Sequence, residues 1–174
     1  TISDTTITGV GAFTSTSIDA TKLSGNLPAI DGSALTGVGK VLQVVNFATA
    51  TANTSTVATY ADTSITLAIT PTLATSKILV SVQINGQYKA GATYGNLRLL
   101  RGATVLAVLE GQVGYTNSAA TNTVGGTASS YLDSPATTAA TTYKVQFKNS
   151  PAVGDFIIQV GAATSTITLM EIGV

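Results

Sequence analysis

The sequence contains no cysteine, no histidine and no tryptophan. These absences remove the thiol nucleophile, the commonest general base, disulfide bonds and the usual zinc ligands. Charged residues make up only 9% of the chain, against about 25% in an ordinary globular domain, and eight basic residues balance eight acidic ones. A neutral chain with scattered basic residues lacks the electrostatic footprint of a nucleic-acid-binding protein. The composition therefore argues against an enzyme, a metal or cofactor site and nucleic acid as a partner.

Long apolar runs and helix signals are also missing. The longest apolar runs, such as residues 41–45, are far shorter than the roughly 18 residues needed to span a bilayer, so no membrane insertion is expected. No window combines an N-cap, a 3.6-residue apolar period and good helix formers. The 31 threonines instead favour strands, because threonine is β-branched. The composition predicts an all-β protein.

The stretch from residue 22 to residue 39 alternates apolar residues with glycines and turn formers. Leu-Ser-Gly at residues 23–25 recurs as Leu-Thr-Gly at residues 35–37. Each unit has an apolar side chain to bury and no partner of its own, a problem that repeat or intertwined assemblies solve with neighbouring chains. We therefore expect residues 1–40 to form an extended fibre-shaft arm that holds a homotrimer together. The residues expected to meet around the trimer axis are Leu23, Leu27, Ile30, Leu35 and Val38.

From residue 41 onward the chain changes to short apolar runs bounded by Gly, Pro, Asn, Asp or Ser. This pattern is typical of a β-sandwich or a β-barrel. We expect residues 41–174 to form one antiparallel, jelly-roll-like β-sandwich head. The expected strands are 41–48, 54–60, 64–70, 77–85, 96–101, 104–110, 127–132, 142–148, 155–160 and 164–172.

The last expected strand has apolar residues on both faces. Ile167 and Leu169 share one face with Glu171, while Met170 and Ile172 interrupt the threonines of the other face. A strand of this kind is predicted to lie in the middle of a sheet, covered on both sides.

The phrase Leu-Ser-Gly-Asn-Leu-Pro-Ala-Ile-Asp-Gly-Ser-Ala-Leu-Thr-Gly-Val at residues 23–38 resembles the shaft-to-head junction of bacteriophage tail-fibre and related virion fibre proteins. Phrases at residues 75–80, 130–135, 143–147 and 164–173 resemble the heads of the same proteins, so the resemblance covers most of the chain. It implies a homotrimeric fibre on the exterior of a virion, on the tail or the capsid. It also implies an arm that contacts other virion proteins and a head that attaches to a host-surface glycan or protein.

Two Gly-rich connections, at residues 85–95 and 111–126, are expected to be long loops. Long loops on a small sandwich often carry function. Tyrosine rings offer a stacking surface, and Asn and Gln amides both donate and accept hydrogen bonds, which suits sugar hydroxyls. The alternative is that these tyrosines anchor their own loops or a subunit interface. The candidate receptor-binding residues are Tyr88, Lys89, Tyr94, Gln112, Tyr115 and Asn117.

Three function classes remain open on the sequence alone. The favoured one is a non-enzymatic attachment fibre. The second is a structural capsid decoration or head-fibre protein that acts in virion assembly or stability. The third is a glycan-cleaving spike, which needs only two carboxylates but is disfavoured by the scarcity of acids and large aromatic residues.

Overall fold

The computed structural model describes residues 40–173 with the exception of Asn117, so every expectation about the N-terminal arm, including the five apolar residues named for it, lies outside the described residues. Ten β-strands and one short 3-10 helix make up the described chain, which confirms the prediction of an all-β protein. No helix of this part is long and apolar enough to cross a membrane. The elements are β1 (Val41–Thr49), β2 (Asn53–Ser55), β3 (Ala61–Ile69), β4 (Lys77–Ala90), β5 (Tyr94–Arg101), β6 (Thr104–Val113), β7 (Asn122–Asp133), β8 (Thr141–Ser150), β9 (Asp155–Ile158), η3 (Val160–Ala162) and β10 (Ser165–Ile172).

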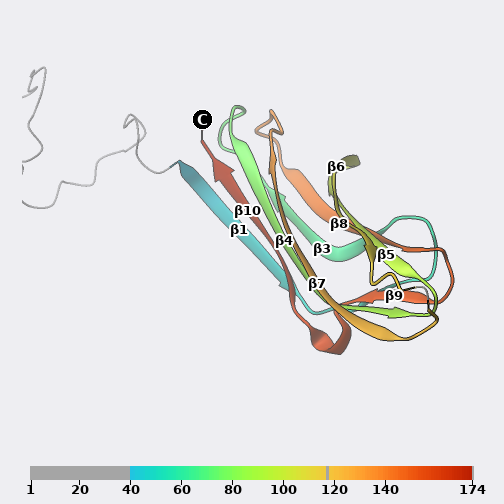
Figure 1. Ribbon diagram of the computed structural model, residues 1–174. Coiled ribbons are helices and arrows are strands. Elements are labelled where there is room, and N and C mark those ends of the chain that lie inside the picture. Colours follow the sequence, from blue (N-terminus) through green and yellow to red (C-terminus); the bar gives the residue numbers. More distant parts are fainter. Residues whose placement is uncertain (1–39, 117, 174) are drawn as a thin grey trace, which may run out of the picture. The chain divides into compact units, whose positions relative to one another are not determined.

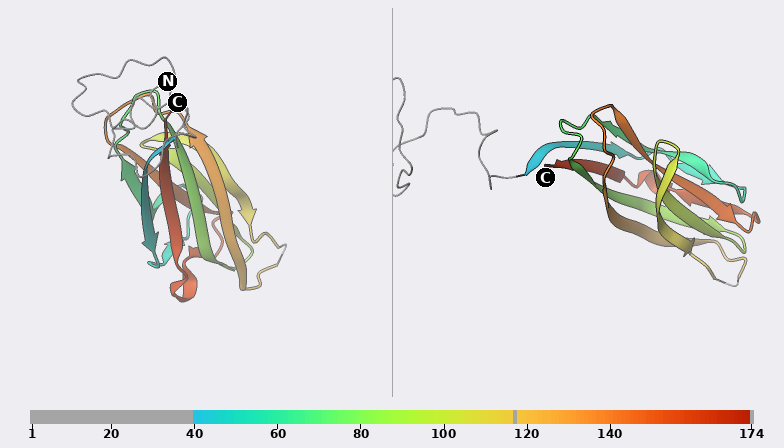
Figure 2. Two further views of the ribbon diagram at one scale, coloured as in Figure 1. Left: turned by 90° about the vertical axis from the view of Figure 1, so that its left-hand side faces the viewer. Right: turned by 90° about the horizontal axis from the view of Figure 1, so that it is seen from above.

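The strands form two antiparallel sheets packed as a β-sandwich (Figures 1 and 2). In the first sheet, here called sheet A, the long strand β4 is central. It pairs with β7 along one edge, and with β10 and then β9 along the other edge. Outside these, β1 pairs with β10 and β2 pairs with β9. The second sheet, sheet B, has the order β3-β8-β5-β6.

The core lies between the two sheets and follows the two-residue period of the strands. In β4, for example, Ile78 and Val80 are buried while Ser81 and Gln83 on the other face are exposed. Each fully buried aliphatic or aromatic side chain contributes about 1.5–3 kcal/mol relative to exposure. The largest apolar side chains of the core are Ile65, Ile84, Leu97, Leu99, Tyr143, Phe147, Phe156, Ile158, Ile167 and Leu169.

Strand β10 lies between β1 and β4, which confirms its predicted central position. Its inner face is fully buried, as expected. Its outer face, which carries Met170 and Ile172, is only half-buried, so no described part of this chain covers it completely. The expectation that both faces are covered is therefore not met within one subunit.

The two ends of the sandwich differ. At one end the described chain begins and finishes together, since the Gly173 N–H donates to the Lys40 carbonyl oxygen over 2.7 Å. The other end, here called the loop end, carries the connections at residues 91–93, 114–121 and 151–154. Figure 1 shows β1 running from the first end towards the second.

Both connections that the sequence predicted as long loops are shorter in the structure. The predicted loop at 85–95 contains the second half of β4 and the start of β5, which leaves a turn at 91–93, and the predicted loop at 111–126 shrinks to 114–121. The reason is that glycine marks bulges here. Gly86, with φ of 62°, lies where the β4–β7 register shifts, and the strand continues beyond it.

Candidate functional site

Two of the predicted tyrosines meet at the loop end. Tyr94 begins β5, and Tyr115 follows β6 directly after Gly114, whose φ of 71° is left-handed. The two ring centroids lie 5.6 Å apart with an interplanar angle of 80°, an edge-to-face contact of the kind worth about 0.5–1.5 kcal/mol. Tyr115 is 57% exposed, so the pair presents an aromatic surface to solvent.

Lys89, another predicted contact residue, faces the interior instead. Its side chain is fully buried. The ammonium donates to the carbonyl oxygens of Thr116 at 3.4 Å and Ser118 at 3.1 Å, and also to the Thr116 hydroxyl. A buried cation needs such partners to offset its lost hydration. Lys89 therefore fastens the β6–β7 connection to β4.

Of the remaining predicted residues, Gln112 meets the Tyr94–Tyr115 pair through its backbone, because its carbonyl oxygen accepts from the Tyr115 N–H over 3.0 Å. Tyr88 lies opposite Ile157 on the outer side of sheet A, because its neighbours in β4 are buried. Gln112 is exposed, with φ of 59°, and its backbone N–H donates to Asn96 Oδ1 over 3.4 Å. Asn117 lies outside the described residues.

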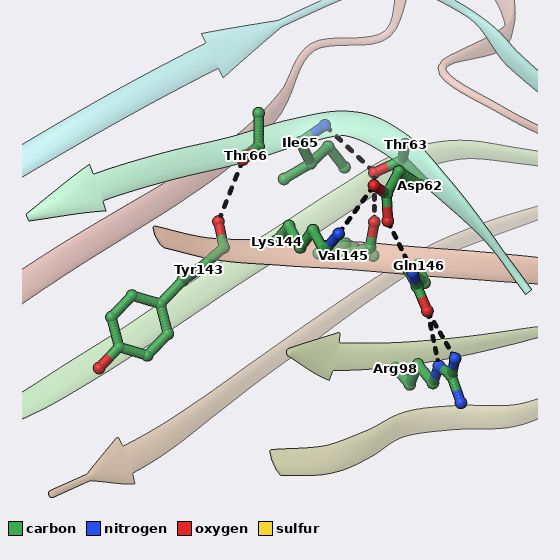
Figure 3. Close-up of polar contacts among 9 residues, drawn as sticks. All are labelled: Asp62, Thr63, Ile65, Thr66, Arg98, Tyr143, Lys144, Val145 and Gln146. Atoms are coloured by element: carbon green, nitrogen blue, oxygen red, sulfur yellow. Dashed lines mark hydrogen bonds and ion pairs between the residues drawn. The ribbon is translucent and has the colours of Figure 1, made fainter. Parts of the chain in front are cut away.

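The outer face of sheet B carries a polar network that the sequence did not reveal (Figure 3). Asp62 of β3 accepts hydrogen bonds from Lys144 Nζ at 2.8 Å and from Gln146 Nε2 at 2.6 Å. The hydrogen bonds from Lys144 and Gln146 lower the pKa of Asp62 below its usual range. Gln146 Oε1 in turn accepts from Arg98 Nε at 2.9 Å and Arg98 Nη2 at 2.6 Å. The network thus joins three neighbouring strands.

Tyr60 extends this network towards the loop end. The Arg98 guanidinium carbon lies 3.7 Å from the Tyr60 ring centroid, and Lys148 Nζ lies 5.0 Å from it. Both are cation–π contacts. Within the described part of the chain, neither Arg98 nor Lys148 forms an ion pair with a carboxylate. Tyr60, Arg98, Gln146 and Lys148 are here called the basic–aromatic cluster.

A bulge between β3 and β8 places Asp62 within reach of both of its partners. Asp62 lies opposite Gln146, and the next pair is Thr66 opposite Lys144. Four residue steps along β3 therefore match only two along β8. The Thr63 hydroxyl fills the gap, donating to the Val145 carbonyl oxygen at 2.9 Å and accepting from the Ile65 N–H at 3.1 Å (Figure 3). The Thr63 hydroxyl therefore supplies hydrogen bonds where the bulge interrupts the backbone pairing of β3 with β8.

The outer face of sheet A has the opposite chemistry. Val44, Met170, Leu79 and Leu132 are register partners on β1, β10, β4 and β7, and form one apolar row across the sheet. Val44 is 52% and Leu132 49% exposed. The next row consists of Asn46, Thr168, Ser81 and Ser130. Among the described residues of these rows and their flanks on this face, Lys77 is the only charged one.

Near the Lys40 end, a buried ion pair links the two sheets. Arg101 Nη1 lies 2.9 Å and 2.7 Å from the carboxylate oxygens of Asp133, and the Tyr143 hydroxyl donates to Asp133 Oδ2 over 2.7 Å. Burial raises the pKa of the Tyr143 hydroxyl, and its hydrogen bond to Asp133 adds to this effect. All three side chains are largely buried, so we assign them a structural role in holding the two sheets together.

Glu171 is buried and binds the β3–β4 connection. Its carboxylate accepts from Gln43 Nε2 at 2.6 Å, from the Thr72 N–H and hydroxyl at 2.8 Å each, and from the Leu73 N–H at 3.3 Å. Burial alone raises the pKa of Glu171, but the hydrogen bonds from Gln43 and Thr72 outweigh it and lower the pKa to about 2. Glu171 is therefore a structural anion.

Within residues 40–116 and 118–173, no group of three His, Cys, Asp or Glu side chains is placed to hold a metal ion. The arrangement offers cations, tyrosine rings and amides on one face and, on the other, a surface whose only charged residue in the rows and flanks described above is Lys77. In comparisons with known proteins, no protein-family model matches the chain and no curated protein is significantly similar to it.

Proposed function

We propose that this chain is a non-enzymatic virion fibre protein whose trimeric, jelly-roll-like head attaches to a host-surface glycan or protein. The strand orders β1-β10-β4-β7 and β3-β8-β5-β6 support the jelly-roll topology, because the chain crosses repeatedly between the six-stranded sheet A and the four-stranded sheet B. The resemblance of residues 23–38 to fibre junctions supports the placement on a virion exterior.

The observation that carries the proposal is the division of chemistry between the two outer faces. Sheet A presents a row of four apolar residues across its strands with flanking Thr, Ser and Asn residues, whereas sheet B presents Tyr60, Arg98, Lys144 and Lys148 beside the exposed Val108. Contiguous apolar surface on a soluble protein marks an interaction site. Copies that meet through sheet A bring together one charged residue each, Lys77, while copies that met through sheet B would bring together Arg98, Lys144 and Lys148.

The geometry therefore suits a head that assembles through sheet A and leaves sheet B and the loop end free. Sheet B then points away from the assembly. A fibre head needs both surfaces at once, one for its own copies and one for a ligand.

Mass measurement of the full chain in solution tests the assembly. We expect three copies at micromolar concentration. The double variant Leu79→Lys and Leu132→Lys places two charges in the apolar row and should give folded monomers. Val108→Lys, at a 67% exposed position of β6 in sheet B, is the matched control and should remain trimeric. A monomeric wild-type chain would overturn the proposal.

The second candidate is a structural role in capsid decoration or assembly. It is favoured by the contacts that Tyr94 and Tyr115 make with each other and by the use of Lys89 to hold its own loop. Replacing Tyr88, Tyr94 and Tyr115 with Ala separates the two candidates. Attachment predicts a loss of about 1–3 kcal/mol per stacked ring in a glycan complex. Unchanged adsorption to cells by an intact trimer favours the structural role.

A further inference from the structure

We propose that the basic–aromatic cluster on sheet B binds the anionic groups, carboxylate or phosphate, of an acidic polysaccharide. This inference rests on the proposed attachment role and supplies its ligand class. It concerns a site centred on Tyr60 and Arg98, neither of which was among the candidate receptor-binding residues.

The Arg98 guanidinium is held in one orientation. It stacks on Tyr60 at 3.7 Å and directs Nε and Nη2 to Gln146 Oε1. Gln146 is itself fixed, because its amide nitrogen donates to Asp62. Arg98 Nη1 has no hydrogen-bond partner among the residues that the structure describes. A guanidinium fixed in this way has lost its side-chain entropy before a ligand arrives, and its fork geometry suits carboxylate and phosphate oxygens.

Positive charge at this site is left without a counter-charge. Asp62 neutralises Lys144, its partner at 2.8 Å. Arg98 and Lys148 flank the same Tyr60 ring, and no carboxylate of the described chain pairs with either. Only 9% of the chain is charged, so two unpaired cations beside the same ring indicate a binding site for an anion.

The surroundings favour a saccharide over other polyanions. Tyr94 and Arg98 lie on the same outer face of β5, so an aromatic side chain leads from the cluster to the Tyr94–Tyr115 pair. Sugar rings use such groups through stacking and through hydrogen bonds to hydroxyls. Nucleic acid carries a phosphate about every 1.7 Å of duplex axis and calls for many more cations than this face offers.

Direct binding to defined polymers tests the inference. The full chain is titrated by calorimetry with oligogalacturonate, which carries carboxylates, with a phosphodiester-linked polyglycerol phosphate, and with uncharged dextran oligomers. We expect binding to at least one of the two anionic polymers and none to dextran, and the tighter of the two identifies the anionic group. Affinity should fall as salt is added, since exposed charges are screened.

Three variants and a control locate the binding on the cluster. Arg98→Gln and Lys148→Gln should each weaken the anionic complex by about tenfold or more, because charge-assisted hydrogen bonds are lost. Arg98→Lys keeps the charge but not the fork, and should recover only part of the affinity. Lys40→Gln removes an exposed cation at the other end of the sandwich and should change nothing.

Three calorimetric outcomes overturn the inference: no binding to either anionic polymer, equal binding to dextran, or anionic binding that survives Arg98→Gln and Lys148→Gln. Adsorption of the wild-type trimer to bacterial cells is measured in parallel. Adsorption that persists in both variants leaves attachment standing and removes only the acidic ligand. Adsorption that protease treatment of the cells abolishes points to a protein receptor and likewise overturns the inference.

Discussion

At the residue scale, the few buried charges of this chain hold connections and sheets in place. Glu171 ties down the β3–β4 connection, Lys89 ties down the β6–β7 connection, and Asp133 links Arg101 to Tyr143 between the sheets. Each has several hydrogen bonds, as buried charges require. The charges that remain at the surface are therefore free to serve interactions with other molecules.

Glu171→Gln is expected to lower the free energy of unfolding at neutral pH. The free energy of unfolding of the variant should also change less as the pH falls. The folded-state pKa of Glu171 is about 2, against an ordinary value of 4.5. Its contribution is thus fully present above pH 4.5 and is lost as the pH falls through 4.5 towards 2. At about 1.4 kcal/mol per pKa unit, the contribution is up to about 3 kcal/mol. Urea unfolding of wild type and variant at pH 7 and pH 2.5 measures it.

The control for that experiment is Asp62→Asn. The pKa of Asp62 is also lowered, by hydrogen bonds from Lys144 and Gln146, but its carboxylate is largely exposed. An exposed pair contributes at most about 1 kcal/mol. A pH profile of Glu171→Gln that parallels the wild-type profile would show that another group carries the acid sensitivity.

At the element scale, glycines decide where strands bend and how closely the sheets approach. Gly95 of β5 faces the core, and a Cβ built there would lie 2.2 Å from the Phe156 ring. Gly95→Ala should therefore destabilise the sandwich by about 1–3 kcal/mol or more through overpacking. Gly111→Ala is the matched control, since its Cβ would meet nothing closer than Asn96 Oδ1 at 3.9 Å. Denaturant midpoints of the two variants provide the comparison, and equal midpoints would contradict the packing argument.

The strands themselves could be predicted from the sequence, because each is a local pattern. All ten appear in the predicted order, although the strand predicted at 54–60 is reduced to β2 at 53–55, and β10 takes the predicted central place. The predicted C-terminal end of β4 and N-terminal end of β7 were wrong, because glycines inside these strands resemble the glycines of loops. Gly86 and Gly125, both with positive φ, sit within strands at or beside register shifts. Whether such a glycine ends a strand depends on pairing with distant segments.

The candidate site was harder to predict for the same reason. The alternation of Lys144, Gln146 and Lys148 with buried residues does predict a polar stripe on one strand. Tyr60, directly before β3, and Arg98 of β5 reach that stripe from elsewhere in the chain. Arg98 and Gln146, for example, are 48 positions apart. Local patterns predict a strand's faces, and only the sheet order brings these side chains together.

At the scale of the whole molecule, the size of the sheet A face limits what the head can do alone. Four strands spaced about 4.8 Å apart, over about six residue steps of 3.3 Å, give roughly 400 Å² of flat surface. A stable interface buries about 800 Å² per partner. The head therefore needs a second contribution to hold a trimer, and the arm is the candidate.

Removal of residues 1–39 is accordingly expected to shift the assembly from three copies to one at micromolar concentration. The shortened chain should keep the β-sheet circular dichroism of the full chain, because the core lies within the sandwich. Sedimentation of both chains over a range of concentrations measures the shift. A shortened chain that remains fully trimeric would assign the whole assembly to the head.

The bond between Gly173 and Lys40 has a mechanical consequence. Strand β1 is an edge strand that starts at this end and pairs antiparallel with β10 through Thr49 opposite Ser165. A pull on the chain at Lys40, opposed by a load at the loop end, acts along the strand axes. It shears the β1–β10 ladder as a whole instead of opening it one bond at a time, so many hydrogen bonds share the tension. In the fibre proposed above, a head built this way would resist unfolding when tension acts between the arm and a bound surface.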